Sequence, residues 1–220
     1  MNLAVLFSGQ SRPERAQLMR DVFTVGALLI SGALDDLSVD ELRKIAPSGD
    51  EPRNITELVG GATVLVRTHE MALLLQRRMD ELAAQQASLV LLACTGDFTE
   101  LRASVPSLIP GRVLEGLVRA ILPQGARLGI LVPLKAQVPD VSRRWEARGY
   151  EVCCAAASPW DAPEAVDAAA TELRAARPSL VLMDCFAYTR EHKERVRAVL
   201  DVLILLPQEI LVLLALQLLN

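Results

Sequence analysis

The chain has little of the chemistry that marks metal, nucleotide and nucleic-acid sites. Among its 220 residues are two histidines, His69 and His192, and four cysteines with no CxxC pair, so a metal site is not expected. The GxxxxGK[ST] spacing of a phosphate-binding loop is missing. The net charge is −4, and the arginines are scattered through helical stretches that also carry acids, which argues against nucleic acid. Small molecules are therefore the expected partners.

Signals for export and for membrane insertion are also missing. The first residues, MNLAVLFSGQSRPER, have a short apolar core without a basic leader or a cleavage pattern, so a strand is expected there. The apolar stretch at 202–219 is split by Pro207, Gln208 and Glu209 into pieces too short for a bilayer core of about 30 Å. We expect a strand and then a buried helix there, no membrane contact, and a cytoplasmic protein with reduced thiols. Two alternatives stay open for the apolar helix at 211–219, which fits either the core or a homodimer interface.

Strand and helix patterns alternate along the chain, and 51% of its residues are hydrophobic, enough for a sizeable core. The segment 25–34 is apolar and of uncertain type, while Ser38 and Glu41 form a capping-box pattern before a short helix. Near-continuous apolar strands are typical of parallel sheets that are covered on both faces. Strands are expected at 3–7, 62–67, 88–94, 127–133, 150–157 and 179–185, and helices at 14–23, 38–47, 69–86, 136–149 and 162–177.

Two segments of the chain repeat one another. SLVLLACTG at 88–96 and SLVLMDCFA at 179–187 both have a cysteine in the seventh place, and similar helices, DELAAQQ and TELRAARP, precede them. Any two helix-to-strand junctions in an alanine- and leucine-rich chain look alike, but the matched cysteines favour internal duplication. We therefore expect an α/β fold with two similar lobes, each a short, mainly parallel sheet flanked by helices, related by a pseudo-twofold axis with a cleft between them. The first lobe is expected to span 1–106 plus 207–220 and to carry Cys94, and the second to span 107–206 and to carry Cys185.

The two matched cysteines predict a particular chemistry. Ligands of parallel sheets bind beyond the carboxyl ends of the strands, where Cys94 and Cys185 are expected to face each other across the cleft. A thiolate and a thiol can remove and return a proton on opposite faces of a carbon next to a carboxylate. Because a free thiol titrates near pH 8.5, a modest downward shift of its pKa ionises one of the pair at neutral pH. This chemistry needs no cofactor.

Polar residues follow the strands that are expected to line this cleft. Thr95 and Gly96 offer a hydroxyl and an unhindered amide beside Cys94, and Tyr188 and His192 share one helix face beside Cys185. Ser8, Gly9 and Gln10 follow the first strand and are expected on the same rim. Each of these observations also has a simpler interpretation, since buried cysteines are common in cores and TREHKER resembles a solvated helix face. Cys153 and Cys154, adjacent in a strand, are expected to be of the buried kind.

Four segments of the sequence resemble the AroM family. They are LDDLSVDELRKIAP at 34–47, SLVLLACTG at 88–96, GRVLEGLVRAILPQGARLGILVP at 111–133 and VLMDCFAYTREHK at 181–193. AroM proteins resemble the aspartate/glutamate/hydantoin racemase superfamily, in which paired cysteines are the acid and the base. The resemblance implies these roles for Cys94 and Cys185. It also implies that Ser8 and Gly9, in the turn after the first strand, belong to the site and that Thr95 holds the carboxylate. Glutamate racemases carry threonine and histidine after the second cysteine, whereas this chain has Phe186 and Ala187.

The residues and the resemblance together leave two hypotheses of different classes. In the first, the protein is a cofactor-independent racemase or isomerase, or a decarboxylase or lyase, that acts on a small carboxylate or amino-acid-like substrate. In the second, it is a non-catalytic metabolite-binding or regulatory protein linked to aromatic amino-acid metabolism, a link suggested by the family name. The matched frames of the two cysteines favour the enzyme.

Overall fold

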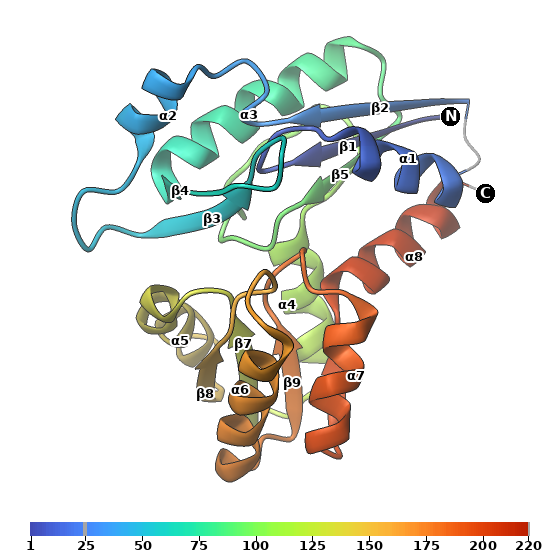
Figure 1. Cartoon of the computed structure of the whole chain (residues 1–220). Helices are drawn as coiled ribbons and strands as arrows, with labels where there is room; N and C mark the ends of the chain where they lie inside the picture. The colour runs from blue at the N-terminus through green and yellow to red at the C-terminus, as the bar shows by residue number, and fades with distance from the viewer. Residues whose placement is uncertain (24–25, 220) are drawn as a thin grey trace. The chain divides into compact units, whose positions relative to one another are not determined.

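The computed structural model describes residues 1–23 and 26–219, apart from the side chains of Arg15, Ala16 and Leu18. The chain divides into two compact units, unit 1 (Met1–Arg112 with Leu211–Asn220) and unit 2 (Val113–Ile210). The first nine elements, all in unit 1, are β1 Asn2–Phe7, α1 Pro13–Val22, β2 Ala27–Gly32, α2 Val39–Ile45, β3 Arg53–Glu57, β4 Thr63–Arg67, α3 Thr68–Ala84, β5 Leu89–Ala93 and β6 Ser107–Leu108. They are followed by α4 Pro110–Ile121, β7 Arg127–Val132, the 3-10 helix η1 Lys135–Gln137, α5 Val138–Glu146, β8 Glu151–Ala156, α6 Pro163–Ala176, β9 Leu180–Met183, α7 Arg190–Val199, β10 Leu203–Leu205 and α8 Pro207–Leu219 (Figure 1).

Each unit is built on a parallel sheet, and the two sheets have the same strand order. In unit 1 the order is β2-β1-β5-β6, and in unit 2 it is β8-β7-β9-β10. In both units the first strand along the chain lies between the second and the third, and the fourth lies beyond the third. Unit 1 also contains an antiparallel hairpin, β3–β4. The predicted α/β class with two mainly parallel sheets is confirmed, while the pseudo-twofold relation and the cleft stay predictions.

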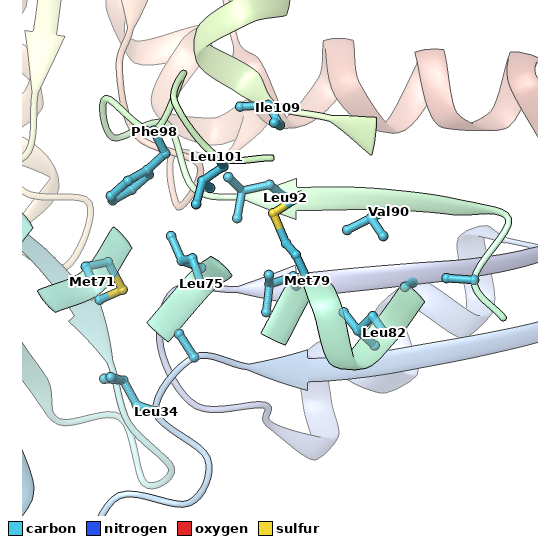
Figure 2. Packing of buried hydrophobic residues seen from close by; sticks show 14 of the residues in the cluster. Leu34, Met71, Leu75, Met79, Leu82, Val90, Leu92, Phe98, Leu101 and Ile109 are labelled. Atoms are coloured by element: carbon cyan, nitrogen blue, oxygen red, sulfur yellow. The ribbon is translucent and has the colours of Figure 1, made fainter. Parts of the chain in front are cut away.

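The core of unit 1 forms between α3 and the sheet. Leu75, Met79 and Leu82 recur at helical spacing along one face of α3 and are nearly or fully buried. They pack with Val90 and Leu92, which alternate along β5 and lie on the same face of the sheet (Figure 2). This packing fixes β5, and with it the position at which Cys94 leaves the sheet.

The sheet of unit 2 is covered on both faces by helices. Leu128, Ile130 and Val132 of β7 pack in one cluster with residues of α4 and α5, including Trp145. Leu131, on the opposite face of β7, packs with residues of α6 and α7. Because both faces are buried, strands such as β7 and β9 read as continuous apolar runs rather than as alternating ones.

The structure confirms the strands and helices expected from the sequence, with small shifts at their ends. The segment 25–34 contains the edge strand β2, although Val25 lies outside the described residues. The capping box of Ser38 and Glu41 is formed as predicted. The hairpin strand β3 was not expected, because its sequence, RNITE, is short and half polar.

The apolar stretch at 202–219 forms strand β10 and helix α8, as predicted. In α8, Leu211 and Ala215 are fully buried, while Leu213 and Leu218 are exposed. No helix in the described part of the chain is both long and apolar enough to cross a membrane.

Candidate functional site

Cys94 lies at the carboxyl end of the sheet of unit 1. Strand β5 pairs with β1 up to Ala93 and Phe7, so Cys94 and Ser8 are the next residues along these neighbouring strands. The carboxyl edge of a parallel sheet is where ligands of such folds bind. The structure therefore brings Ser8 and Cys94, predicted from distant parts of the sequence, to the same edge.

The hairpin β3–β4 contacts this edge where β1 ends. The hydroxyl groups of Ser8 and Thr56 form a hydrogen bond of 3.1 Å, and both residues are buried. The backbone N–H of Gln10 donates to the carbonyl oxygen of Glu57 at 3.1 Å. A Cβ atom at Gly9 would lie 2.2 Å from that same carbonyl oxygen, so no other residue fits there without a backbone shift. Gly9 thus permits the close approach of the hairpin to the end of β1.

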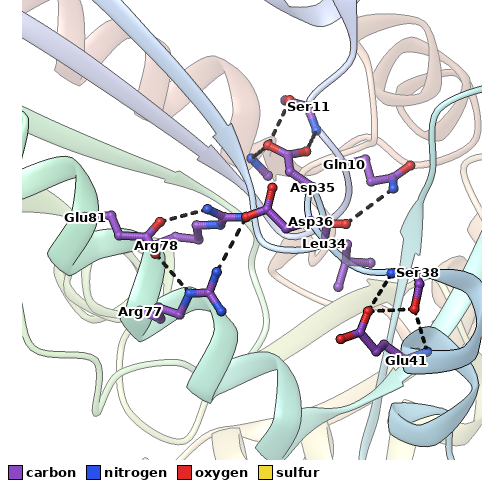
Figure 3. Close-up of polar contacts among 11 residues, drawn as sticks. Gln10, Ser11, Leu34, Asp35, Asp36, Ser38, Glu41, Arg77, Arg78 and Glu81 are labelled. Atoms are coloured by element: carbon purple, nitrogen blue, oxygen red, sulfur yellow. Dashed lines mark hydrogen bonds and ion pairs between the residues drawn. The ribbon is translucent and has the colours of Figure 1, made fainter.

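The loop that follows β1 is held by polar contacts within unit 1. Gln10 donates from its amide nitrogen to the Leu34 carbonyl, and its amide oxygen accepts from the N–H of Val59. Asp35 accepts three hydrogen bonds, from the N–H and the hydroxyl of Ser11 and from the N–H of Gly32 (Figure 3). The side chain of Gln10, predicted as substrate-binding, thus connects this loop to two other segments of unit 1.

Thr95 and Gly96 follow Cys94, and an asparagine from the hairpin lies against them. Thr95 is 5% exposed. A Cβ atom at Gly96 would lie 2.5 Å from the ring of Phe98 and 2.7 Å from Oδ1 of Asn54. The other end of the Asn54 amide, Nδ2, donates to the Thr68 hydroxyl at 2.9 Å. Asn54 was not predicted from the sequence, because β3 was not expected to be part of this edge.

Arg12 is a second residue near this edge that was not predicted from the sequence. Its guanidinium group forms an ion pair of 2.6 Å with the carboxylate of Glu57, and both side chains are mostly buried. The Nε atom of Arg12 is buried without a hydrogen-bond partner in the described part of the chain. The pair is expected to be nearly neutral overall, because the two opposite charges lie in direct contact.

Cys185 lies at the corresponding edge of unit 2. Strand β9 ends at Met183, and Asp184 then donates from its N–H to the Leu131 carbonyl at 2.8 Å, which extends the contact with β7. The N–H of Tyr188 donates to the Cys185 carbonyl at 3.3 Å, so Cys185 begins a tight turn. Like Cys94, it is partly exposed, and no disulfide joins either of them to another cysteine.

Tyr188 and His192 lie close together, with ring centroids 5.7 Å apart in an edge-to-face arrangement. Tyr188 is fully buried, donates its hydroxyl proton to the Ala157 carbonyl at 2.5 Å, and has a pKa well above 10 because of burial. His192 Nδ1 accepts a hydrogen bond of 3.0 Å from the N–H of Thr189, and the Pro159 carbonyl bonds to the ring as well. Burial lowers the pKa of His192 below 6.5, so the ring is neutral at pH 7. In this structure the polar atoms of both residues hold the loop and the start of α7.

A buried ion pair lies directly before Cys185. Arg144 of α5 donates to the Asp184 carboxylate at 2.7 Å, and their side chains are 14% and 5% exposed. Asp184 occupies the repeat position that Ala93 occupies in unit 1. The two repeats therefore differ in charge immediately before their cysteines.

The repeat seen in the sequence is also present in the backbone. Gln86 and Arg177 both have positive φ angles, 61° and 53°, and each lies two residues before the serine that begins its repeat. Ser88 donates from its N–H to the Asn2 carbonyl, and Ser179 donates in the same way to the Arg127 carbonyl, both at 2.8 Å. Cys94 and Cys185 thus follow the third strand of equivalent sheets in the same register.

Within residues 1–23 and 26–219, no three metal-ligating side chains gather where they could hold an ion.

Comparison with solved structures shows which class of fold this is. A glutamate racemase from Francisella tularensis, in complex with D-glutamate, matches with a TM-score of 0.60 and 11% identity over 99% of this chain and 80% of its own. An allantoin racemase from Pseudomonas fluorescens matches with a TM-score of 0.59 and 17% identity over 99% and 90%. A liganded variant of arylmalonate decarboxylase matches with a TM-score of 0.61 and 10% identity over 99% and 92%. The chain thus has the α/β fold of the Asp/Glu racemase superfamily.

The family within this class follows from the sequence itself. Residues 3–219 match the family described as AroM protein, which is nearly the whole chain. The chain therefore belongs to the AroM family. Comparison with curated protein sequences gave no significant match.

Proposed function

We propose that this AroM protein is a cofactor-independent racemase or isomerase that acts on the carbon next to the carboxylate of a small substrate. The observation that carries the proposal is the equivalence of Cys94 and Cys185, each following the third strand of its sheet in the same register. One thiolate removes the α-proton and the other thiol returns a proton from the opposite face, in either direction. The mechanism requires both sulfur atoms to reach one carbon from opposite sides.

The residues around Cys94 support a carboxylate ligand. Negative charge builds on the carboxylate as the α-proton leaves, and hydrogen-bond donors must stabilise it. The hydroxyl of Thr95 and the backbone N–H groups after Cys94 are suited to this task, because these residues directly follow strand β5 at the carboxyl edge of the sheet. Ser8 instead joins the end of β1 to the hairpin, since its hydroxyl is already bonded to that of Thr56.

Proton exchange in D₂O tests the proposal. We expect the full-length protein to replace the α-proton of at least one member of a panel of amino acids and 2-substituted carboxylic acids, detected by NMR, and to interconvert its enantiomers. Cys94→Ser and Cys185→Ser should each lower the rate of interconversion by about 10²- to 10⁴-fold, the usual contribution of a general acid or base. Each variant should also lose exchange with the enantiomer whose proton the missing thiol removes.

Cys153→Ser is the matched control, because Cys153 lies within strand β8 rather than at the end of a strand. It should retain exchange. If no panel member exchanges and one of them still raises the melting temperature, the result would contradict catalysis and support a metabolite-binding protein instead.

A further inference from the structure

The buried ion pair before Cys185 has no counterpart at the equivalent position of unit 1. Asp184 stands where the other repeat has Ala93. Arg144 donates to its carboxylate at 2.7 Å, and the two side chains are 14% and 5% exposed. Apolar residues in place of a buried ion pair are often neutral or stabilising, so stability alone does not explain the pair. A charge pair at one of two equivalent sheet ends points to different tasks for the two cysteines.

The alternation of side chains along β9 shows which end of the pair lies toward Cys185. Leu182 packs in the cluster of α4 and α5, and Met183 packs in the cluster of α6 and α7. Asp184 returns to the first side, where it meets Arg144 of α5, and Cys185 packs on the second side. The carboxylate is joined directly to the backbone before Cys185, while the guanidinium group reaches it from the helix beyond. The negative end of the pair therefore lies nearer the thiol.

The effect of the pair on neighbouring residues agrees with this geometry. Burial raises the pKa of Tyr188 well above 10, and the negative charges of Cys185 and Asp184 raise it further. On the α5 side, burial raises the pKa of Cys154, and Asp184 raises it by more than Arg144 lowers it. The two opposite charges thus do not cancel at the residues around them.

We infer that the Arg144–Asp184 pair places negative charge beside Cys185 and keeps its thiol protonated at neutral pH, which makes Cys185 the acid and Cys94 the base of the resting protein. The inference rests on the proposed function and assigns a part to each thiol. A nearby negative charge disfavours the thiolate, and Ala93 puts no charge directly before Cys94. Asp184 and Arg144 are positioning residues, because they act through Cys185.

The other titratable groups on this side of the sheet leave that role to Asp184. Tyr188 keeps its proton because its pKa is well above 10, and His192 of α7 is neutral at pH 7. Cys153 of β8 has a pKa of about 11, and the buried residues of α6 are apolar. Asp161, in the loop after β8, is exposed, so water and salt screen its charge.

The pH at which each thiol is half ionised tests the inference. Iodoacetamide reacts with the thiolate, so its rate against pH, followed by mass mapping, gives this midpoint. Cys185 is measured in Cys94→Ser protein and Cys94 in Cys185→Ser protein, so that neither titration contains the other thiol. We expect the midpoint of Cys185 to be higher than that of Cys94. A midpoint of Cys185 at or below that of Cys94 would overturn the inference.

Variants of Asp184 separate the effect of its charge from a structural role. Asp184→Asn has nearly the same shape and still accepts from Arg144, but it lacks the charge, so the midpoint of Cys185 should fall by about 1 pH unit. Asp184→Glu keeps the charge and should leave the midpoint close to the wild-type value. The matched control is Glu151→Gln, which removes an acid paired with Arg127 at 2.8 Å at the amino end of the same sheet. It should not move the midpoint.

A structural role predicts a different pattern. The midpoint of Cys185 would then stay unchanged in Asp184→Asn and move only in Asp184→Ala, which also removes the contact with Arg144, and this result would overturn the inference. The comparison of Cys185 with Cys94 needs no substitution at the pair, so it decides the inference if Asp184→Asn does not fold.

Failure of the inference and failure of the proposed function can be told apart. In the pH profile of kcat/KM for α-proton exchange, the basic limb reports loss of the acid's proton, and it should move to lower pH in Asp184→Asn together with the midpoint of Cys185. Exchange with an unmoved basic limb and midpoint would overturn the inference and leave the proposed function standing. A shifted midpoint without exchange of any panel member would contradict the proposed function and support the effect of the pair on Cys185.

Discussion

At the level of single residues, position in the strand separates the four cysteines into two kinds, although all four are partly exposed. Cys153 and Cys154 lie inside β8 on opposite faces, Cys153 packed in the cluster of α6 and α7 and Cys154 in that of α4 and α5. Burial raises the pKa of Cys153 to about 11, and it also raises the pKa of Cys154. Cys94 and Cys185 lie beyond the ends of their strands.

The first prediction concerns thiol reactivity. At pH 7.5 iodoacetamide should modify Cys94 and Cys185 much faster than Cys153 and Cys154, since only the thiolate reacts and about 0.1% or less of a thiol with a pKa near 11 is ionised. Mass mapping of the native protein over time measures the four rates separately. Equal inertness of all four thiols would contradict the proposed acid–base mechanism.

The second prediction concerns His192 and pH. Burial lowers the pKa of His192 below 6.5, so the unfolded state binds more protons than the native state as the pH falls. The free energy of unfolding should therefore decrease from pH 6.5 downward until the native ring is also protonated. In His192→Gln the amide can still accept from the Thr189 N–H, and this part of the decrease should disappear.

Urea unfolding at pH 7.5, 6.5 and 5.5 measures this effect, with His69→Gln as the control because His69 is exposed. The control should show the same decrease as the wild type. A decrease of unchanged size in His192→Gln would show that other groups cause it.

At the level of elements, the contact of hairpin β3–β4 with the end of β1 depends on the lack of a side chain at Gly9. A Cβ atom there would lie 2.2 Å from the Glu57 carbonyl oxygen, which belongs to the hairpin backbone. That backbone oxygen also accepts the hydrogen bond from Gln10, so it cannot move freely. A side chain at Gly9 is therefore expected to displace both the hairpin and the loop after β1.

The third prediction compares two glycines. Gly9→Ala should destabilise the protein by about 1–3 kcal/mol, the usual cost of forcing extra atoms into a packed region. Gly116→Ala should stabilise it by about 0.5–1 kcal/mol, because Gly116 is exposed within α4 and a Cβ atom there meets nothing within 4 Å. Denaturant unfolding measures both changes, and a neutral Gly9→Ala would contradict the close approach of the hairpin.

At the level of the whole molecule, the chain returns to unit 1 at its end. Residues Leu211–Asn220 belong to unit 1 although they follow unit 2 in the sequence. Leu211 and Ala215 of α8 are fully buried, whereas Leu213 is 59% exposed. The last turns of α8 thus contribute to the core as well as to the surface.

The fourth prediction uses two leucines of α8. Leu211→Ala should lower the free energy of unfolding by about 2–5 kcal/mol, the range for large-to-small changes in cores. Leu213→Ala should change it by no more than about 0.5 kcal/mol. Sedimentation of the Leu213 variant also tests the homodimer, because loss of a dimer on this substitution would place the exposed face of α8 at the interface.

The α/β class, the alternating elements and the repeat of the two cysteines could be predicted from the sequence. The reason is that apolar runs such as 127–133, with both faces buried, leave a clear local pattern. Ser8 and Cys94 were also placed at one edge by a general rule, that the carboxyl ends of parallel strands are adjacent. The roles of Gln10, Tyr188 and His192 were less predictable, since the sequence does not say which backbone groups their polar atoms reach.

Asn54 shows what only the tertiary structure decided. The sequence RNITE carries no signal for a site, because the polarity of Asn54 and Thr56 is as common in loops as in binding residues. The packing of the hairpin against β1 and β5 is a long-range contact, and it depends on the absence of side chains at Gly9 and Gly96. The sequence by itself thus determined the two sheets and their cysteines through local hydrophobic pattern, whereas the polar groups beside Cys94 were decided by contacts between distant segments.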